Sequence, residues 1–492
     1  MYHTRAVARL LELTPVAESV LRTDLLAAQH ELRKQGAGPV LVVLAGPETA
    51  DRGDTANELN AWMDPRWLKT WAWGEPSDEE RERPWFWRYW RALPPRGLVA
   101  LYLSGWYGPV IQDFAESRSG KRAFERQVRE INRFERAMTD DGAVVVKIWL
   151  HVDQETQRER LKALEADPLR RWRAGADQWH RLQRHDAVVR VWKRAADLTD
   201  SPAAPWRVID RSDAKSPMTG VATAVRDAIR QALKSASASV PGAPATPAVA
   251  SPVKDRLSAL DLTRTVSKRR ALVDLERHQG RLYEAQRLAR ERGISTIAVF
   301  EGWDASGKGG AVRRCTAALD ARYFQIVPIA APTDEELAHH YLWRFWRHIG
   351  RAGHVTIFDR SWYGRVLVER VEKFARPDEW QRAYDEINDF EEQLTEHGVV
   401  VVKFWLHVSR DEQLDRFRKR QEIAHKQWKI TDEDWRNRDK WNAYADAVNE
   451  MVDRTSTRRA PWTLVEGNDK RYARVKVVKT LADRIRRALK RR

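Results

Sequence analysis

Short apolar runs alternate with longer segments of helical periodicity along the C-terminal half of the chain. An amphipathic helix is predicted near residues 266–292, ending at Gly293, and a second helix follows the next apolar run to about Leu319. Three runs have the length and composition of buried strands: 294–301, 355–359 and 399–408. Strands that alternate with helices in this way predict an α/β fold, with a parallel sheet covered by helices on both faces.

The same pattern occurs twice in the chain. Residues 97–108 (GLVALYLSGWYG) align without gaps to 353–364 (GHVTIFDRSWYG). Residues 141–152 (DGAVVVKIWLHV) align to 397–408 (HGVVVVKFWLHV), with nine of twelve positions identical. Both pairs are 256 residues apart. Because the spacing between matching positions stays constant over most of each half, we predict two tandem domains of one fold. Two copies are fewer than a solenoid needs.

An uncharged segment separates the two copies. Residues 235–253 contain only Ala, Pro, Ser, Val, Gly and Thr, and four of them are prolines. Such a composition cannot bury enough apolar surface to fold and is typical of a linker. We therefore expect a first domain over 1–232, a linker over 233–255 and a second domain over 256–492.

The composition narrows the class of protein. In 492 residues, 87 Lys and Arg against 70 Asp and Glu give a formal net charge of +17. This charge predicts a polyanionic partner, which could be nucleic acid, an anionic membrane surface or a phosphate-rich substrate. The single cysteine, Cys315, excludes an intrachain disulfide, and no apolar run approaches the roughly 18–20 residues of a membrane helix. We expect a soluble, cytoplasmic protein.

A glycine-rich turn follows the run 294–301 and opens the next helix. In Gly302-Trp-Asp-Ala-Ser-Gly307-Lys308-Gly309, the glycines let backbone N–H groups face phosphate oxygens, and the helix N-terminus adds its positive end. Lys308 would supply a positive charge to the transferring group. The alternative interpretation is a turn with an incidental lysine.

This loop departs from the usual nucleotide-binding pattern at one position. Gly309 stands where a Ser or Thr hydroxyl would normally contact Mg²⁺, so the metal needs other ligands. The candidates are the carboxylates of Asp304, inside the loop, and Asp359, at the end of the predicted strand 355–359. The alternative is that Asp304 is an ordinary turn residue.

Basic residues surround these candidates in the sequence. Arg360 and Arg365 follow Asp359, and Arg313 and Arg314 lie early in the helix after the loop. Arginines beside a phosphate loop could orient an acceptor and neutralise charge during phosphoryl transfer. Structural ion pairing is the alternative for each arginine.

A basic helical stretch lies near 410–440. Arg416, Lys419 and Arg420 share one helix face by their spacing, and Lys426 and Lys429 follow. Kinases of this architecture close a basic lid over phosphates, and we predict that this segment is such a lid. A solvated charged face is the alternative.

The first copy lacks the candidate residues. At the spacing of 256, Lys308 corresponds to Arg52 and Asp359 to Leu103. The other replacements are Gly307 by Asp51, Gly310 by Asp54, Arg360 by Ser104 and Arg365 by Pro109. Because carboxylates and a leucine would replace the phosphate cradle and a metal ligand, we expect the first domain to keep the fold without catalysis.

The C-terminal half resembles the polyphosphate kinase 2 family over essentially all of residues 256–492. The motifs that carry the resemblance are FEGWDASGKGG (300–310), PTDEELAHHYLWRFW (332–346), FDRSWYGRVLVERVE (358–372), KFWLHVSRDEQLDRF (403–417), KQWKITDEDW (426–435) and APWTLVEGNDK (460–470). A glycine at position 309 is normal for that family. Two fused domains with only the second intact further resemble its polyphosphate:AMP phosphotransferase subgroup.

The resemblance implies a thymidylate-kinase-like P-loop fold and reversible transfer of the terminal phosphoryl group of inorganic polyphosphate to AMP, giving ADP, with Mg²⁺. It implies that Asp304 and Lys308 act in the loop, that Asp359 and Arg360 act in the second motif, and that a lid near 416–440 holds polyphosphate. The remaining predicted phosphate- and nucleotide-binding residues are Gly302, Gly307, Gly309, Arg314, Arg365, Lys426 and Lys429.

Two other functions stay open at this point. An ATP-dependent nucleotide kinase could use the same loop, and a non-catalytic protein could bind polyphosphate or nucleic acid. The intact set of Lys308, Asp304 and Asp359 argues against a pure binder. We expect neither a membrane nor nucleic acid as the partner, and domain–domain packing could join copies of the chain into a homo-oligomer.

Overall fold

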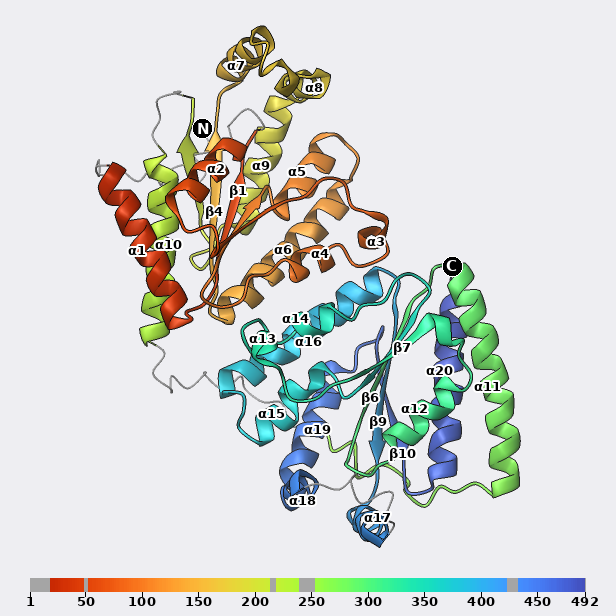
Figure 1. The fold of residues 1–492 in the computed structure, drawn as a ribbon. Helices are drawn as coiled ribbons and strands as arrows, with labels where there is room; N and C mark the ends of the chain where they lie inside the picture. Colours follow the sequence, from red (N-terminus) through yellow and green to blue (C-terminus); the bar gives the residue numbers. More distant parts are fainter. Residues whose placement is uncertain (1–17, 48–51, 213–217, 239–252, 423–431, 492) are drawn as a thin grey trace. The chain divides into compact units, whose positions relative to one another are not determined.

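The structure is a computed structural model that describes residues 18–47, 52–212, 218–238, 253–422 and 432–491. The chain divides into two compact units. The first comprises Met1–Pro76, Arg88–Pro241 and Asp334–His340, and the second comprises Ser77–Trp87, Gly242–Thr333 and Tyr341–Arg492. Each unit contains one five-stranded sheet (Figure 1).

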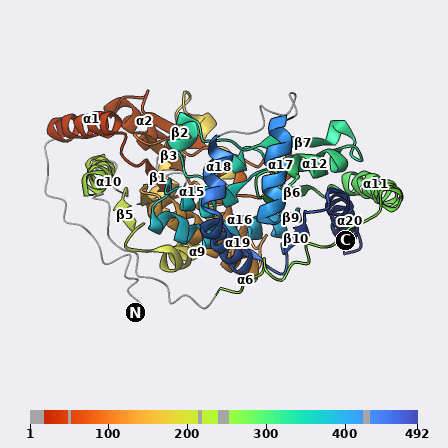
Figure 2. The same ribbon diagram turned by 90° about the horizontal axis from the view of Figure 1, so that it is seen from below.

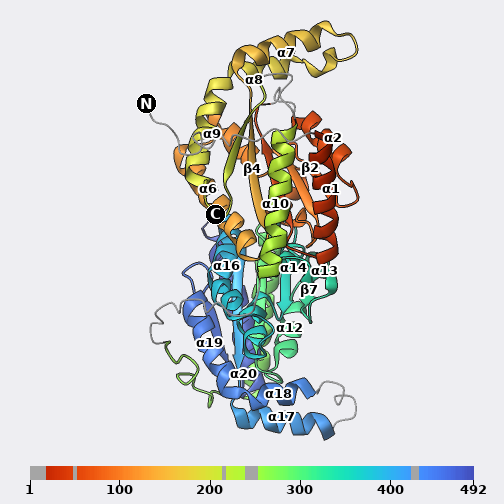
Figure 3. The same cartoon turned by 90° about the vertical axis from the view of Figure 1, so that its left-hand side faces the viewer.

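The sheet of the first unit is parallel, with the order β2-β3-β1-β4-β5. Its strands are β1 (Val40–Ala45), β2 (Leu68–Ala72), β3 (Val99–Leu103), β4 (Val144–His151) and β5 (Trp206–Asp210). Helices α1 and α10 pack together on one side of the sheet, and α6 and α9 lie on the other (Figure 3). The helices are α1 (Glu18–Gln35), α2 (Arg52–Trp62), α5 (Tyr107–Ala115), α6 (Lys121–Asp140), α7 (Gln154–Ala166), η2 (Arg171–Arg173), α8 (Ala176–Gln183), α9 (His185–Thr199), α10 (Thr219–Ala238) and α13 (Asp334–Leu337). Helix α4 (Trp87–Arg91) begins at the last residue of the segment 77–87 and continues in the first unit.

The sheet of the second unit is also parallel, with the order β10-β9-β6-β8-β7. Its strands are β6 (Thr296–Gly302), β7 (Phe324–Pro328), β8 (Val355–Asp359), β9 (Val400–His407) and β10 (Trp462–Glu466). Helices α11, α12 and α20 lie on one side, and α16 and α19 on the other (Figure 1). The helices are α3 (Asp78–Arg81), α11 (Lys268–Glu291), α12 (Lys308–Thr316), η3 (Ala321–Tyr323), α14 (Trp343–Trp346), η4 (Trp362–Val366), α15 (Val368–Val371), α16 (Pro377–Glu396), α17 (Arg410–Glu422), α18 (Asp432–Asp439), α19 (Trp441–Thr455) and α20 (Lys470–Leu489).

Strand β6 lies at the centre of the second sheet, and helices cover both of its faces. Its residues Ile297, Ala298, Val299 and Phe300 are all buried, which explains why the strand is a continuous apolar run rather than an alternating one. Helix α20 presents one apolar stripe to the same core: Val477, Val478, Leu481, Ala482 and Ile485. Burial of this stripe holds α20 against α11 and the sheet.

These elements confirm the predicted α/β fold of two tandem parallel-sheet domains. The helix predicted to reach Leu319 ends at Thr316. Helix α10 continues through Ala238, into the range predicted as linker, because residues 233–238 include Leu, Lys and Ala, which are strong helix formers. Residues 239–252 of the predicted linker lie outside the described ranges. Among the helices that the structure describes, none has the length and hydropathy of a membrane span.

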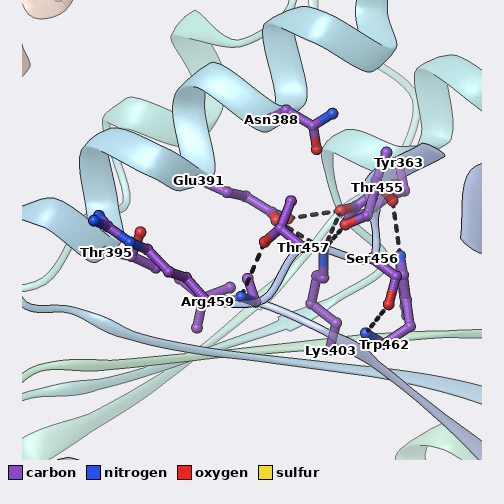
Figure 4. Close-up of polar contacts among 12 residues, drawn as sticks. Tyr363, Asn388, Glu391, Thr395, Lys403, Thr455, Ser456, Thr457, Arg459 and Trp462 are labelled. Atoms are coloured by element: carbon purple, nitrogen blue, oxygen red, sulfur yellow. Dashed lines mark hydrogen bonds and ion pairs between the residues drawn. The ribbon is translucent and has the colours of Figure 1, made fainter. Parts of the chain in front are cut away.

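A buried ion pair occupies the same place in both units. In the second unit, Lys403 Nζ lies 2.7 Å from Glu391 Oε2, and it also bonds to the Tyr363 hydroxyl and the Thr455 carbonyl oxygen (Figure 4). The first unit repeats this network with Lys147, Glu135, Tyr107 and Thr199. Burial lowers the pKa of Lys403, and the adjacent Glu391 opposes that shift. Because the first unit keeps the network, we assign it to the fold and not to catalysis.

The parallel strands bring their carboxyl ends to one edge of the second sheet. Gly302 of β6 pairs with Leu406 of β9, and Phe300 of β6 pairs with Asp359 of β8. Helices α17 and α18 lie together beyond this edge (Figures 1 and 2). Ligands of open α/β sheets bind outside the carboxyl ends of the strands, so this edge is where the functional site is expected.

Candidate active site

Backbone geometry shapes the loop between β6 and α12. Gly302 has φ 150°, and a Cβ there would lie 2.5 Å from the Leu406 carbonyl oxygen, so only glycine fits. Ala305 and Gly307 also have positive φ, at 59° and 108°. Gly307 begins α12 without a side-chain cap, and a Cβ at Gly309 would meet open space. The loop therefore presents an uncapped helix N-terminus to a ligand, which suits a phosphate group.

Lys308 places its ammonium within the loop. Its Nζ donates to the Gly302 carbonyl oxygen at 2.7 Å, and the Trp303 carbonyl oxygen is 3.4 Å away. These are neutral acceptors, which a phosphate oxygen could replace with a stronger, charge-assisted bond. The role of Lys308 in phosphoryl transfer stays a prediction.

Asp304, in the loop, and Arg360, after β8, lie close to each other. Arg360 Nη2 lies 3.5 Å from Asp304 Oδ1, and the side chain of Arg360 is 46% exposed. Burial lowers the pKa of Arg360, but the nearby carboxylates of Asp304 and Glu301 more than compensate and raise it overall. Asn437 Nδ2 donates to the other oxygen of Asp304 at 2.9 Å.

Asp359 is the last residue of β8 and lies beside a buried carboxyl group that the sequence analysis missed. Glu301, the residue before Gly302, is 5% exposed, and it accepts a hydrogen bond from Ser361 Oγ at 2.8 Å. Burial raises the pKa of Glu301, and the charge of Asp359 adds to this, whereas Ser361 and Lys308 oppose it. The first copy has Ala45 and Gly105 at the positions of Glu301 and Ser361, and comparing the halves would have revealed the pair.

Arg416 does not lie on a phosphate-facing lid surface, so its predicted grouping with Lys419 and Arg420 was wrong. Its side chain is 3% exposed and donates five hydrogen bonds within the protein. The acceptors are the carbonyl oxygens of Ala305, Ser306, Gly467 and Asn468 and the carboxylate of Glu412. A guanidinium has five N–H groups, so Arg416 has no donor left for phosphate and instead holds the loop against the turn before α20.

The other predicted basic residues are more dispersed. Arg365 forms ion pairs with Glu369 at 3.1 Å and Glu379 at 3.9 Å and stacks over the Tyr341 ring. Arg314 lies in α12, and its charge contributes to lowering the pKa of Arg474, after the larger effect of burial. Lys426 and Lys429 lie outside the described residues, so their predicted phosphate binding stays a prediction.

In the first unit, the corresponding positions are occupied by internal pairs. Arg52, at the position of Lys308, donates to Ser104, at the position of Arg360. Arg173 forms an ion pair of 3.1 Å with Asp54, which replaces Gly310. These contacts engage Arg52 and Arg173 within the protein, and the loss of catalysis in the first unit stays a prediction.

The carboxylates of the second unit fit a hard divalent cation. Within the described residues, no group of three or more His, Cys, Asp or Glu side chains could hold a metal by itself. Mg²⁺, however, typically uses one or two carboxylates and completes its shell with substrate phosphates and water. Asp304, in the loop after β6, and Asp359, at the end of β8, are the two carboxylates that would hold it.

The fold and the site define a P-loop phosphotransferase: a parallel sheet, a phosphate-type loop with its lysine, and carboxylates and an arginine at adjacent strand ends. The chain belongs to the polyphosphate kinase 2 family, whose family model matches residues 16–237 and 265–492. The two matches show that both units are members of one family, as the duplication predicted.

Known proteins resemble nearly the whole chain. It is 46% identical over 471 residues to a polyphosphate:AMP phosphotransferase of Pseudomonas aeruginosa, an alignment that covers 96% of this chain and 95% of that protein. It is 33% identical over 479 residues to a polyphosphate:AMP phosphotransferase of Acinetobacter johnsonii, covering 95% and 96%. A crystal structure described as a polyphosphate kinase 2 of P. aeruginosa has a TM-score of 0.86 and 44% identity, covering 96% of this chain and 95% of that one.

Proposed function

We propose that the second unit transfers the terminal phosphoryl group of inorganic polyphosphate to AMP, giving ADP, with Mg²⁺ as the metal. The observation that carries the proposal is that Lys308, Asp304, Asp359 and Arg360 gather at one sheet edge in the second unit. Of these, Lys308, Asp359 and Arg360 are replaced in the first copy by Arg52, Leu103 and Ser104. Relatives that align along the whole chain are named for this reaction.

The transition state of phosphoryl transfer is loose and mainly needs positioning and charge neutralisation, and each residue would supply one of these. The loop backbone and Lys308 would bind the donor phosphates. Mg²⁺, held by Asp304 and Asp359, would neutralise phosphate charge. Arg360 would orient the phosphate of the acceptor and stabilise the charge that develops on the transferring group.

An open surface pocket lined by three cationic and two acidic residues supports an extended polyanion as the donor. Its volume is about 600 Å³, and its lining includes Lys470, Arg471 and Arg474 at the start of α20, together with Glu412 and Asp469. Burial, together with neighbouring cations, lowers the pKa values of Lys470 and Arg474. These cations lie close together and are partly buried, so they favour a multivalent anion that neutralises several of their charges at once.

The acceptor is the part of the proposal that depends most on the relatives. A Rhizobium meliloti protein named ADP-polyphosphate phosphotransferase 2 is 40% identical over 189 residues, but the alignment covers only 38% of this chain and 62% of that protein. The relatives that match both units are named for AMP. We therefore propose AMP, and we propose a cytoplasmic location, which suits the single buried cysteine.

A donor-by-acceptor assay tests the proposal. The purified full-length protein is incubated with polyphosphate or ATP as the donor and with AMP, ADP or GMP as the acceptor, and products are separated by chromatography. The proposal expects polyphosphate with AMP to be the fastest combination and to give ADP. Preferred use of ATP would instead support an ATP-dependent nucleotide kinase, and preferred phosphorylation of ADP would overturn the acceptor assignment.

A further inference from the structure

We propose that Asn437, on α18, is a positioning residue that orients the carboxylate of Asp304 for metal binding. This inference rests on the proposed function, because it assumes that Asp304 is a ligand of the divalent cation. It adds a residue outside both the loop and the second motif to the machinery of the site.

Two hydrogen bonds fix the side-chain amide of Asn437. Its Nδ2 donates to Asp304 Oδ2 at 2.9 Å, and its Oδ1 accepts from the Tyr444 hydroxyl at 3.1 Å. An amide donates only through its nitrogen and accepts only through its oxygen, so these two partners together define its orientation. The donor end of Asn437 therefore faces the carboxylate of Asp304.

Glu372 anchors the helix on which Asn437 lies. Its side chain is 5% exposed, and Oε2 lies 2.6 Å from Lys440 Nζ and 3.4 Å from Arg436 Nε. The Tyr444 hydroxyl lies 3.4 Å from the other oxygen of Glu372. One buried carboxylate thus pairs with a cation on each side of Asn437 in the sequence, Arg436 and Lys440.

An aromatic stack fixes the start of α19 on the same loop. The rings of Trp303 and Trp441 are nearly parallel, at 7°, and their centroids are 3.8 Å apart. Trp303 precedes Asp304, and Trp441 follows Lys440, the last residue before α19. The loop and α18–α19 are therefore joined by a polar contact and by a stack next to it.

The duplicated unit indicates that these contacts belong to the site and not to the fold. At the spacing of 256, Asn437 corresponds to Arg181, Tyr444 to Val188, Lys440 to Arg184 and Trp441 to His185. The buried Lys403–Glu391 network, by contrast, is present in both units. Asn437 and Tyr444 are thus replaced together with Lys308 and Asp359, as expected for residues that serve the same reaction.

By holding Oδ2 of Asp304, Asn437 would set the direction of Oδ1, the oxygen left for the metal. Asn437 binds Oδ2, while Oδ1 faces Arg360 at 3.5 Å. Carboxylate rotation about χ2 is otherwise broad, so a fixed donor on one oxygen selects the direction of the other. Removing a partner that orients a metal ligand typically lowers metal affinity or activity about 10–100-fold.

The test measures Mn²⁺ binding to the full-length protein by electron paramagnetic resonance of the free ion, with and without tripolyphosphate. Mn²⁺ suits the same oxygen ligands as Mg²⁺ and reports binding directly, apart from turnover. We expect Asn437→Ala to raise the Kd for Mn²⁺ about 10–100-fold. We expect Tyr444→Phe to raise it less, and the double variant to match Asn437→Ala, because Tyr444 acts through Asn437.

Asp439→Asn is the matched control, because Asp439 is exposed on the same helix, and we expect it to bind Mn²⁺ like the parent. A folded Asn437→Ala protein with the affinity of this control would overturn the inference. If that variant does not fold, a folded Tyr444→Phe protein with unchanged affinity overturns it instead. A parent protein that transfers phosphoryl groups but binds no Mn²⁺ refutes the inference alone, whereas a parent with no transfer refutes the proposed function.

Discussion

Arg416 and Arg360 are both arginines beside the phosphate loop, yet their guanidinium groups differ in what they can bind. Arg416 is 3% exposed and gives all five donors to protein acceptors. Arg360 is 46% exposed and reaches Asp304 at 3.5 Å. The same residue type therefore shapes the loop in one case and keeps a partly exposed guanidinium in the other, which in the proposed function would bind the acceptor phosphate.

Arg416→Lys should lower kcat by up to about 10²-fold while the protein stays folded. Lysine has three donors on one nitrogen and cannot reach the carbonyl oxygens of both the loop and the turn before α20, so the loop loses its position. The check is kcat together with the dependence of polyphosphate affinity on salt. If Arg416 only positions the loop, the slope of log polyphosphate affinity against log salt concentration stays unchanged in the variant. A slope smaller by about 0.7 would mean that Arg416 contacts phosphate directly.

His407 should make the second unit sensitive to acid. Its Nδ1 accepts a hydrogen bond from Trp303 Nε1 at 3.0 Å, and burial lowers its pKa from 6.5 to about 4. The unfolded chain therefore takes up a proton between pH 6.5 and about 4 that the folded chain excludes. This contribution to stability is complete above pH 6.5, is lost as the pH falls through that window, and amounts to at most about 3 kcal/mol.

His407→Gln isolates this effect, because glutamine can still accept from Trp303 without titrating. Thermal unfolding midpoints are measured between pH 7 and pH 4 for the parent and the variant. We expect the midpoint of the parent to fall more than that of the variant across the window. Equal losses in both proteins would show that His407 is not the group responsible.

At the scale of elements, the site consists of one continuous segment and several contacts from distant segments. The strand, loop and helix at 296–316 are local in sequence, so the glycine and lysine spacing was sufficient to predict them. The contact of Asn437 with Asp304 joins residues 133 positions apart, and no local pattern indicates it. Arg416 was misread for the same reason, since helical spacing defines a face but not what covers it.

The start of α20 and the loop should together form an extended polyphosphate track. Polyphosphate affinity should therefore fall steeply with rising salt, by analogy with counterion release from nucleic acids, and affinity for AMP should fall much less. Lys470→Ala and Arg474→Ala should each make the slope of log polyphosphate affinity against log salt concentration shallower by about 0.7. Binding is measured at several salt concentrations, and equal slopes for polyphosphate and AMP would argue against an extended track.

At the scale of the whole molecule, the two units share one fold, and the candidate site residues are kept in the second. The first unit keeps the buried Lys147–Glu135 pair but fills its former site with Arg52–Ser104 and Arg173–Asp54. A unit that keeps its core after losing its chemistry can still serve as a packing partner. We predict this role for the first unit, where it would cover apolar surface of the second.

Expressing the halves separately tests this role. We expect residues 256–492 alone to self-associate or melt at a lower temperature than the full chain, and residues 1–232 alone to show no transfer. Light scattering, calorimetry and the polyphosphate–AMP assay give the three readouts. A fragment 256–492 that stays monomeric with an unchanged melting temperature and full activity would refute the packing role, and any turnover by 1–232 would refute its inactivity.

The most direct test of the central claim compares two matched substitutions in the full-length protein, Lys308→Ala and Arg52→Ala. The two positions correspond across the duplication, so each variant removes the loop cation of one unit. The measurement is the rate of ADP formation from AMP and polyphosphate. We predict a loss on the order of 10²–10³-fold for Lys308→Ala and a rate within about twofold of the parent for Arg52→Ala. Near-parental activity of a folded Lys308→Ala protein, or a comparable loss in Arg52→Ala, would contradict the assignment of catalysis to the second unit.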